Sequence, residues 1–350
     1  RSADRPIAVA PRPLEDLTGI PKQIQTLLDR KGQVILFGPP GTGKTFWAMK
    51  AARQIGARRN LGRNWDDLSS GEQEIVRSRI TLCTFHPAYG YEDFIERFEP
   101  YEANGQVAFR RENGVFRALC DAAAGSPKQA FYLVIDEINR GDMPRIFGEL
   151  LTLLEKDKRE GHPVRLPLSK ELFTVPKNVF LIGTMNTADR SIALLDTALR
   201  RRFGFIELMP DASLFSNSIV GGNRLFLDKW FVGLNRRIVE ETGHDGRNLQ
   251  VGHSFFLSEG GRPLVDPDAF MDVFRHELIP LVQEYCYNDW AALARILGET
   301  FVDPAKRSFK ESPFSSPDSF FDALITAFKP DDLAPPSEPD DGALGRPDDD

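Results

Sequence analysis

The stretch G-P-P-G-T-G-K-T at residues 38–45 decides the fold of this 350-residue chain. It directly follows the apolar run V-I-L-F at 34–37 and directly precedes a helix-prone stretch at 46–53. A strand, a glycine-rich turn and a helix start in this order are the context that a P-loop requires. Glycines let consecutive backbone N–H groups turn toward an anion, and the helix adds its positive N-terminal end. We therefore expect this turn to bind the phosphates of a nucleoside triphosphate.

All eight residues of the loop are candidate nucleotide ligands: Gly38, Pro39, Pro40, Gly41, Thr42, Gly43, Lys44 and Thr45. The Lys44 amine can reach the outer phosphates, and the Thr45 hydroxyl is a candidate ligand for Mg²⁺. The alternative is a surface glycine turn, which the match of both the octet and its flanks disfavours.

Two acidic residues, Asp136 and Glu137, follow the continuous apolar run F-Y-L-V-I at 131–135. Such runs are typical of central parallel strands buried on both faces, and open α/β sheets bind ligands at the carboxyl ends of these strands. We expect Asp136 to hold the hydration shell of Mg²⁺ and Glu137 to polarise the attacking water. A solvated pair of acids at a strand end is the alternative.

Asn186 and a run of arginines complete the candidate catalytic set. Asn186 follows the next apolar run, at 179–182, where its amide could orient the water or contact the γ-phosphate. Arg200, Arg201 and Arg202 end a helix predicted at 191–200, and cations at that end commonly balance the helix dipole. A guanidinium lent to a neighbouring subunit's nucleotide can add about 10³–10⁵ in rate. If Arg201 does this, the active site forms between subunits and the protein must oligomerise.

Strands alternating with helices predict an α/β nucleotide-binding domain at 14–210, with a parallel sheet flanked by helices. A smaller all-helical domain is predicted at 211–329, after an extended lead-in at 1–13 and before a disordered acidic tail at 330–350. The further elements that we expect are helices at 20–30, 144–156, 225–242, 270–285, 290–297 and 320–328, strands at 80–85 and 205–208, a hairpin at 106–116 turning at Asn113-Gly114, a second hairpin at 166–175, a loop at 60–71 and a linker at 210–223.

The net charge of −7 comes from the end of the chain. Eight of the 51 acidic residues but only one of the 44 lysines and arginines lie at 330–350, so residues 1–329 carry 43 of each. A neutral body argues against strong non-specific DNA binding by the monomer.

Cysteine usage and hydropathy indicate the compartment. Cys83, Cys120 and Cys286 lie far apart and form no C-x-x-C pair, so we expect neither zinc nor a disulfide framework and favour a reducing cytoplasm. No apolar run approaches the roughly 18 residues that span a bilayer, so no membrane partner is expected.

The order of these motifs resembles that of AAA+ motor ATPases, and their details resemble the McrB family. That family supplies the GTP-hydrolysing subunit of restriction systems directed against modified (5-methylcytosine) DNA. The matching strings are T-F-H-P-A-Y-G-Y-E-D-F-I-E-R-F-E-P at 84–100, V-I-D-E-I-N-R at 134–140, F-G-E-L-L-T-L-L-E-K-D-K-R at 147–159, M-N-T-A-D-R-S at 185–191, A-L-R-R-R-F at 198–203 and V-G-H-S-F-F at 251–256. The resemblance covers about 14–285.

The resemblance implies a hexameric ring, Mg²⁺ as cofactor, Asn186 as sensor 1 and Arg201 as arginine finger with Arg202 supporting it. It also implies activation by a McrC-like nuclease subunit in anti-phage defence. In the family an N-terminal domain reads modified DNA, and nothing in this sequence matches it, so we expect DNA to be engaged only through that missing domain or the partner. His253 is a candidate for sensor 2, with a core histidine as the alternative.

The residues leave the choice of base open. The string N-T-A-D at 186–189 resembles the guanine motif N-K-x-D of small GTPases, but Asn186 is expected to face the γ-phosphate. GTP therefore follows from the family resemblance, and ATP remains open. Two other functions also remain: a MoxR-like AAA+ ATPase with a remodelling or chaperone role, and a nucleotide-locked assembly module with negligible turnover alone.

Overall fold

The computed structural model describes residues 14–103, 105–159, 161–189, 197–221 and 224–328. The chain divides into two compact units, the first comprising Arg1–Gly38 and Gly43–Leu208, the second Pro39–Thr42 and Met209–Asp350. The predicted lead-in at 1–13 and tail at 330–350 lie outside the described residues.

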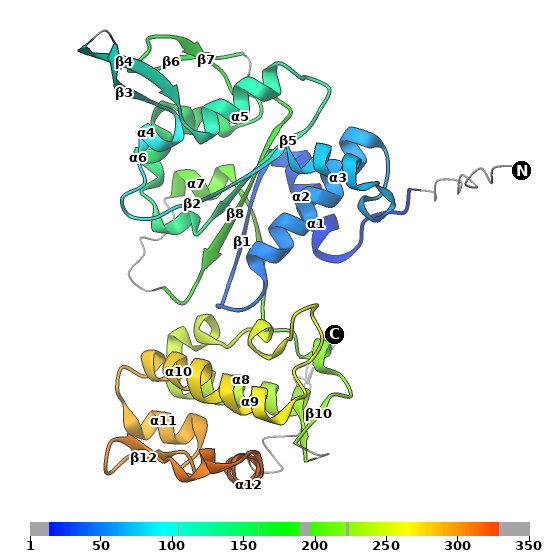
Figure 1. Ribbon diagram of the computed structural model, residues 1–350, viewed down its shortest axis with the longest axis vertical. Coiled ribbons are helices and arrows are strands. Elements are labelled where there is room, and N and C mark those ends of the chain that lie inside the picture. The colour runs from blue at the N-terminus through cyan, green and yellow to red at the C-terminus, as the bar shows by residue number, and fades with distance from the viewer. Residues whose placement is uncertain (1–13, 104, 160, 190–196, 222–223, 329–350) are drawn as a thin grey trace, which may run out of the picture. The chain divides into compact units, whose positions relative to one another are not determined.

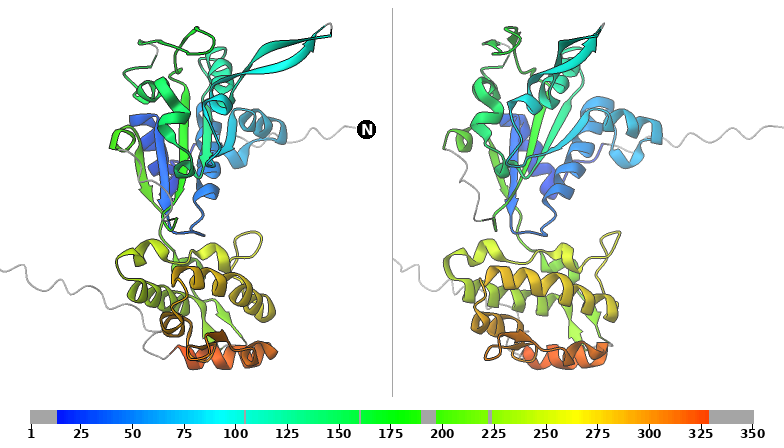
Figure 2. Two further views of the ribbon diagram at one scale, coloured as in Figure 1. Left: turned by 90° about the vertical axis from the view of Figure 1, so that its left-hand side faces the viewer. Right: turned by 60° about the vertical axis from the view of Figure 1, so that its left-hand side comes forward.

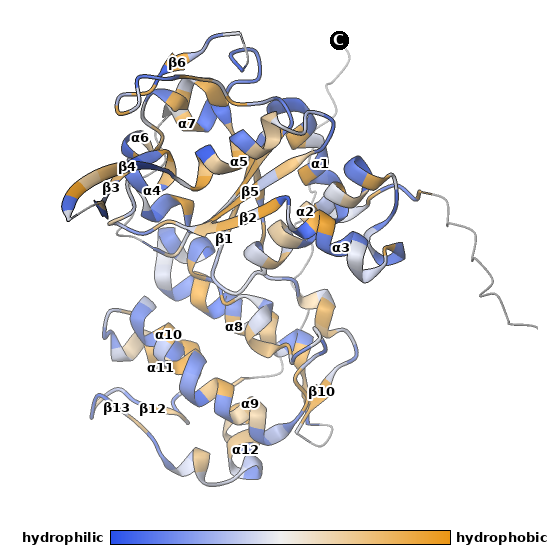
Figure 3. Ribbon diagram, turned by 45° about the horizontal axis from the view of Figure 1, so that its top comes forward, coloured by the Kyte–Doolittle hydropathy of each residue, from blue (hydrophilic) through white to orange (hydrophobic). Residues whose placement is uncertain are grey.

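A five-stranded parallel sheet forms the centre of the first unit, in the order β2-β5-β8-β1-β9 (Figure 1). The strands are β1 Gln33–Gly38, β2 Ile80–Thr84, β5 Phe131–Asp136, β8 Val179–Asn186 and β9 Gly204–Glu207. Figure 3 shows the hydrophobic colouring of these strands. The three runs of apolar residues form the three central strands because a strand covered on both faces needs apolar side chains on both. The predicted α/β fold with a parallel sheet is confirmed.

Helices cover both faces of the sheet because successive strand residues point to opposite sides (Figure 2). Val34 and Leu36 pack into one buried cluster with residues of α1 and α2, whereas Ile35 packs into another with residues of α5, α6 and α7. The helices of the first unit are α1 Gly19–Lys31, α2 Lys44–Leu61, α3 Ser70–Arg77, α4 Tyr91–Phe94, α5 Val115–Ala124, α6 Met143–Phe147 and α7 Thr197–Arg202.

The first hairpin turns at a different place from the one predicted. β3 (Glu96–Ala103) pairs antiparallel with β4 (Gln106–Asn113), with Ala103 opposite Gln106 and Gly105 at a φ of 74° just before β4. Asn113-Gly114 instead ends β4 and precedes α5, so the prediction of a turn there is wrong. Gly114 is required by close packing, since a Cβ on it would lie 2.3 Å from the carbonyl carbon of Phe94. A second hairpin is present, but it begins earlier than predicted: β6 (Val164–Arg165) pairs with β7 (Leu172–Phe173).

Two other local predictions need correction. The helix predicted at 144–156 ends as α6 at Phe147, and Gly148, with a φ of 50°, leads into the 3₁₀ turn Gly148–Leu154. The loop predicted at 60–71 contains the 3₁₀ turn Trp65–Asp67 and the start of α3, whose first turn is closed by a capping box between Ser69 and Glu72.

The second unit is mainly helical rather than all-helical as predicted, because it also contains two short antiparallel strand pairs. Its core is aromatic: Trp230 packs edge-on against Phe256 and Phe270. The helix predicted at 270–285 contains a π turn, Phe274–Leu278, just before Pro280, which has no N–H to donate. The elements are β10 Ile219–Val220, β11 Leu225–Phe226, α8 Leu227–Thr242, α9 Pro267–Val273, α10 Ile279–Tyr285, α11 Trp290–Leu297, β12 Val302–Asp303, β13 Ser308–Phe309 and α12 Pro317–Ala327.

The linker predicted at 210–223 includes the 3₁₀ turn Ala212–Phe215 and β10. Across the part of the chain that the structure describes, every helix is too short or too polar to span a membrane.

Candidate active site

The P-loop joins the end of β1 to the start of α2 in a backbone conformation that depends on glycine. Gly38, Gly41 and Gly43 have φ values of 151°, 75° and 74°, which side-chain-bearing residues rarely adopt. A Cβ on Gly38 would lie 2.1 Å from the Leu208 carbonyl oxygen, so no larger residue fits. The Thr42 hydroxyl donates to the Pro39 carbonyl over 2.9 Å and closes the middle of the loop.

Lys44, the first residue of α2, is buried, and its Nζ donates to the Gly38 carbonyl over 3.1 Å. Burial lowers the pKa of Lys44 to about 8, although the carboxylates of Glu137, Asp136 and Asp189 act in the opposite direction. Since an anionic phosphate beside the amine favours its protonated form, ligand binding would raise this pKa again.

Asp136 ends β5 beside the start of α2. The Thr45 hydroxyl donates to Asp136 Oδ1 over 2.6 Å, so the two predicted magnesium residues lie in direct contact. Hydroxyl and carboxylate oxygens are the hard donors that Mg²⁺ prefers, and beside phosphates it needs only one or two carboxylates. Thr45 and Asp136 supply one hydroxyl and one carboxylate of this kind.

Glu137 follows β5 in the left-handed region, with φ 52° and ψ 45°, which costs a non-glycine residue about 1–2 kcal/mol. The turn aims its carboxylate at β8, where Asn186 Nδ2 donates to Glu137 Oε1 over 2.5 Å. Burial raises the pKa of Glu137; Arg140 and Lys44 oppose this, while Asp136 and Asp189 add to it. The structure therefore brings the predicted base and the predicted sensor amide together.

Our sequence reasoning did not identify Arg140 or the partner of Asp189. Arg140 donates to Asp189 Oδ2 through Nη2 over 2.8 Å and through Nε over 3.2 Å, and its Nε lies 3.5 Å from Glu137 Oε2. Both residues stand in strings quoted above, but 49 positions separate them and hide the pairing. Arg140 therefore links Asp189 to Glu137 and places Asp189 near the acidic pair Asp136 and Glu137.

Arg201 and Arg202 lie at the opposite edge of the sheet. Lys31 Nζ donates to the Arg201 carbonyl over 2.8 Å, and Gln33 Nε2 donates to the Arg202 carbonyl over 2.7 Å. Gln33 begins β1 and Gly38 ends it, and the five steps between them at about 3.3 Å each span roughly 17 Å. The structure therefore does not bring these arginines together with Lys44, Asp136, Glu137 or Asn186 of the same chain.

The two arginines differ in exposure. Arg202 is buried, and its Nε lies 2.9 Å from Glu155 Oε1. The Arg201 side chain is 68% exposed, with Nη2 3.7 Å from the same oxygen. The Arg201 side chain is thus largely exposed despite its long contact with Glu155, whereas the Arg202 side chain is buried against the same residue.

His253 is buried in the second unit, where its Nδ1 accepts the N–H of Asp211 over 3.2 Å. Burial lowers the pKa of His253, and Asp211 opposes this. This contact stabilises the segment around Asp211; a sensor 2 role for His253 stays a prediction.

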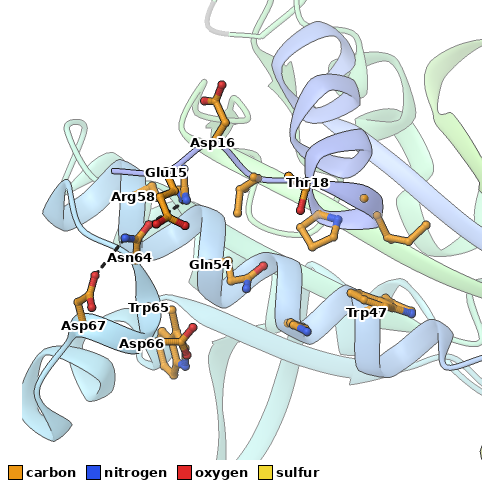
Figure 4. A pocket seen from close by; sticks show the side chains of 15 residues that line it. Glu15, Asp16, Thr18, Trp47, Gln54, Arg58, Asn64, Trp65, Asp66 and Asp67 are labelled. Carbon is orange, nitrogen blue, oxygen red and sulfur yellow. Dashed lines mark hydrogen bonds between the residues drawn. The ribbon is translucent and has the colours of Figure 1, made fainter. Parts of the chain in front are cut away.

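A cavity of about 390 Å³ lies beside α2 in the first unit (Figure 4). Trp47, Lys50, Gln54 and Arg58 line it from one side of α2, and Lys50 Nζ lies 4.8 Å from the ring centre of Trp47. Neither the P-loop lysine nor the acidic pair lines this cavity.

Comparison with known proteins identifies both units. Residues 33–203 match the family described as AAA domain (dynein-related subfamily), and residues 226–294 match the family described as McrB, alpha-helical lid domain. The second match agrees with the helical fold of the second unit.

Two curated relatives carry restriction functions in their names. The Type IV methyl-directed restriction enzyme EcoKMcrB subunit of Escherichia coli (strain K12) is 37% identical over 294 residues, which is 79% of this chain and 59% of that protein. The Type II restriction enzyme BsuMI component YdiS of Bacillus subtilis (strain 168) is 27% identical over 206 residues, 49% of this chain and 55% of that protein. This chain thus spans a little over half the length of either relative. With an AAA domain, a McrB lid domain and this identity over most of its length, the chain belongs to the McrB-type AAA+ family.

Proposed function

We propose that this chain hydrolyses a nucleoside triphosphate and acts as the motor subunit of a restriction system for modified DNA. GTP is the favoured substrate because of the likeness to McrB-type proteins, with ATP as the alternative. The observation that carries the proposal is the contact between Glu137 and Asn186, with Asp136 and Thr45 paired beside them. A strand-end acid pair without a catalytic role would not need the strained turn that aims Glu137 at an amide.

In the proposed mechanism the N–H groups of residues 38–45 and the Lys44 amine bind the phosphates. Thr45 and Asp136 would hold Mg²⁺, which supplies positive charge beside the γ-phosphate when bound. Asn186 Nδ2 occupies Glu137 Oε1, whereas Oε2 is buried and makes no hydrogen bond to the described residues. Glu137 Oε2 is therefore the oxygen that would accept the proton of the attacking water, with Asn186 fixing its direction.

We further propose that Arg201 serves the nucleotide of a neighbouring copy, with Arg202 supporting it. The supporting observation is that roughly 17 Å of strand separates the start of β1, where Arg201 lies, from the P-loop of the same chain, while the Arg201 side chain is 68% exposed. A ring of copies, hexameric by family resemblance, would place Arg201 beside the P-loop of the next copy.

We also propose that the nucleotide-binding domain spans 14–210 and the helical domain 211–329.

The whole protein is proposed to work in the cytoplasm with a McrC-like nuclease subunit in anti-phage defence, and to meet DNA through that partner or through a further N-terminal domain. The name of the EcoKMcrB relative supports the restriction role. The three free cysteines fit a reducing compartment.

The Glu137→Gln variant tests the hydrolytic proposal. It removes the base but keeps the shape and the hydrogen bond from Asn186, so turnover should fall by about 10²–10⁴ while nucleotide binding persists. GTP and ATP turnover should be compared with and without a McrC-like partner, with Glu102→Gln on the exposed hairpin as the matched control.

The outcomes separate the functions. GTP turnover that Glu137→Gln abolishes supports the restriction motor, whereas equal or preferential use of ATP would favour a remodelling ATPase. Tight binding with negligible turnover under every condition would favour a nucleotide-locked assembly module. Undiminished turnover by Glu137→Gln would contradict the assignment of the base.

A further inference from the structure

Thr184 lies at the point where both acidic side chains are held. It is 2% exposed in β8, and the register of β5 with β8, Ile135 opposite Gly183, places it beside Asp136. The Thr184 hydroxyl donates to Asp136 Oδ1, and Thr184 Oγ1 in turn accepts a hydrogen bond from the backbone N–H of Glu137 over 3.2 Å. One hydroxyl thus contacts the proposed magnesium residue and the proposed base.

A hydroxyl makes both contacts through a single oxygen, because it donates one hydrogen and accepts through its lone pairs. Asp136 Oδ1 receives hydroxyl hydrogens from two sides, Thr45 at the start of α2 and Thr184 on β8. The carboxylate is therefore fixed between the helix that follows the P-loop and the neighbouring strand.

The second contact holds the backbone of Glu137, which adopts the left-handed conformation rare for residues with a side chain. Thr184 and Asn186 are two residues apart on one strand and so point to the same face of the sheet. Asn186 grips the end of the Glu137 side chain, while Thr184 grips its N–H. Together they fix the base at both ends.

We propose that Thr184 is a positioning residue for hydrolysis, whose hydroxyl sets the Mg²⁺-binding carboxylate of Asp136 and the direction of Glu137 at once. The proposal rests on the hydrolytic function proposed above. It goes beyond that function by assigning the alignment of the two acids to a buried strand residue.

The test compares Thr184→Val, which keeps the shape and loses the hydroxyl, with Thr184→Ser, which keeps the hydroxyl and loses the methyl group. Loss of such a supporting contact commonly costs about 10–100-fold in activity or metal affinity, so Thr184→Val should lower kcat by that factor. The kcat of Thr184→Ser should stay within about threefold of the wild type, because serine keeps the hydroxyl that makes the supporting contacts. Thr81→Val, the same change in β2 away from the acids, is the matched control.

A second readout does not need turnover. The affinity for a non-hydrolysable GTP analogue is measured with and without Mg²⁺, and the gain on adding Mg²⁺ should shrink by about 10-fold in Thr184→Val. Binding without Mg²⁺ should stay unchanged, and so should the gain in Thr184→Ser and Thr81→Val. If Thr184→Val does not fold, Thr184→Ala is compared with Thr184→Ser in its place.

Wild-type kcat and Mg²⁺ gain in the variant without the hydroxyl would overturn the proposal. Equal losses in Thr184→Ser would overturn it as well, because they would assign the effect to methyl packing. If the wild type binds nucleotide with a normal Mg²⁺ gain but hydrolyses nothing, the proposed function fails, while the Mg²⁺ readout still decides the role of Thr184.

Discussion

The carboxyl ends and the amino ends of the strands in the five-stranded sheet, here called its carboxyl edge and its amino edge, carry different kinds of contacts. At the carboxyl ends of the strands, Asp136 accepts hydrogen bonds from Thr45 and Thr184, and Glu137 Oε1 accepts one from Asn186. At the amino ends of the strands, buried Gln33 binds the Arg202 carbonyl and the Arg202 side chain pairs with Glu155, while the Arg201 side chain is largely exposed.

This difference separates chemistry from assembly. In the proposed function, the carboxyl ends of the strands carry the phosphate-binding turn, the oxygen pair for Mg²⁺ and the base, so these groups would act on a nucleotide bound to the same chain. The amino edge presents a cation about one strand length away from that nucleotide. We infer that the chain contains one nearly complete site and one component of its neighbour's site.

The largest effect should come from breaking the amino edge with Arg201→Ala. If the guanidinium serves a neighbouring nucleotide, turnover should fall by about 10³ or more while nucleotide affinity stays unchanged. Steady-state hydrolysis and equilibrium binding measure the two quantities, and Arg200→Ala, one position away, is the control.

Mixed assemblies make this prediction sharper. A mixture of Arg201→Ala with Glu137→Gln should regain part of the turnover, because an intact site can then form between one chain's Glu137 and the other chain's Arg201. No recovery in mixtures that are shown to co-assemble, or a loss of affinity with normal turnover, would contradict the assignment.

Much of the carboxyl edge could be predicted from the sequence, because its parts are local. The P-loop octet, the run at 131–135 with its two acids and the run at 179–182 with Asn186 each carry their signal within about ten residues. Parallel strands then align these ends in space without further information. The five-stranded sheet follows from the same runs.

The amino edge and the supporting contacts could not be predicted in this way. Gln33 binds Leu154 and Arg159, more than 120 residues away, and nothing in the local pattern marks it. Thr184 resembles any other strand residue until the register places it beside Asp136. The turn at Asn113-Gly114 was mispredicted for a related reason. Glycine is required at position 114 because the backbone of Phe94 packs closely against it, and this contact lies outside its own segment.

A smaller effect is expected at the carboxyl edge from Lys44. With its pKa lowered to about 8 by burial, the amine is charged below that pH and loses its proton above it. Phosphates need the charged form, so affinity for nucleotide without Mg²⁺ should weaken above pH 8, by up to about tenfold per pH unit. Equilibrium titrations between pH 6.5 and 9.5 measure this, and Lys44→Gln should bind weakly with no such slope. An equal slope in Lys44→Gln would assign the titration to another group.

The smallest change should be the effect of Asp189→Asn on the preference for GTP over ATP, as distinct from its effect on the rate of turnover. Asp189 is bound by Arg140 beside Glu137, among groups that face the phosphates in the proposed mechanism, so it is not placed to read guanine. Turnover should drop because Arg140 loses its partner, but the ratio of kcat/KM for GTP to that for ATP should change by no more than about twofold. If Asp189 did bind guanine, Asp189→Asn would alter that ratio by orders of magnitude. A buried group that hydrogen-bonds a substrate discriminates strongly against a substrate that lacks the partner group. A collapse of the ratio would therefore mean that this edge reads the base as well as the phosphates.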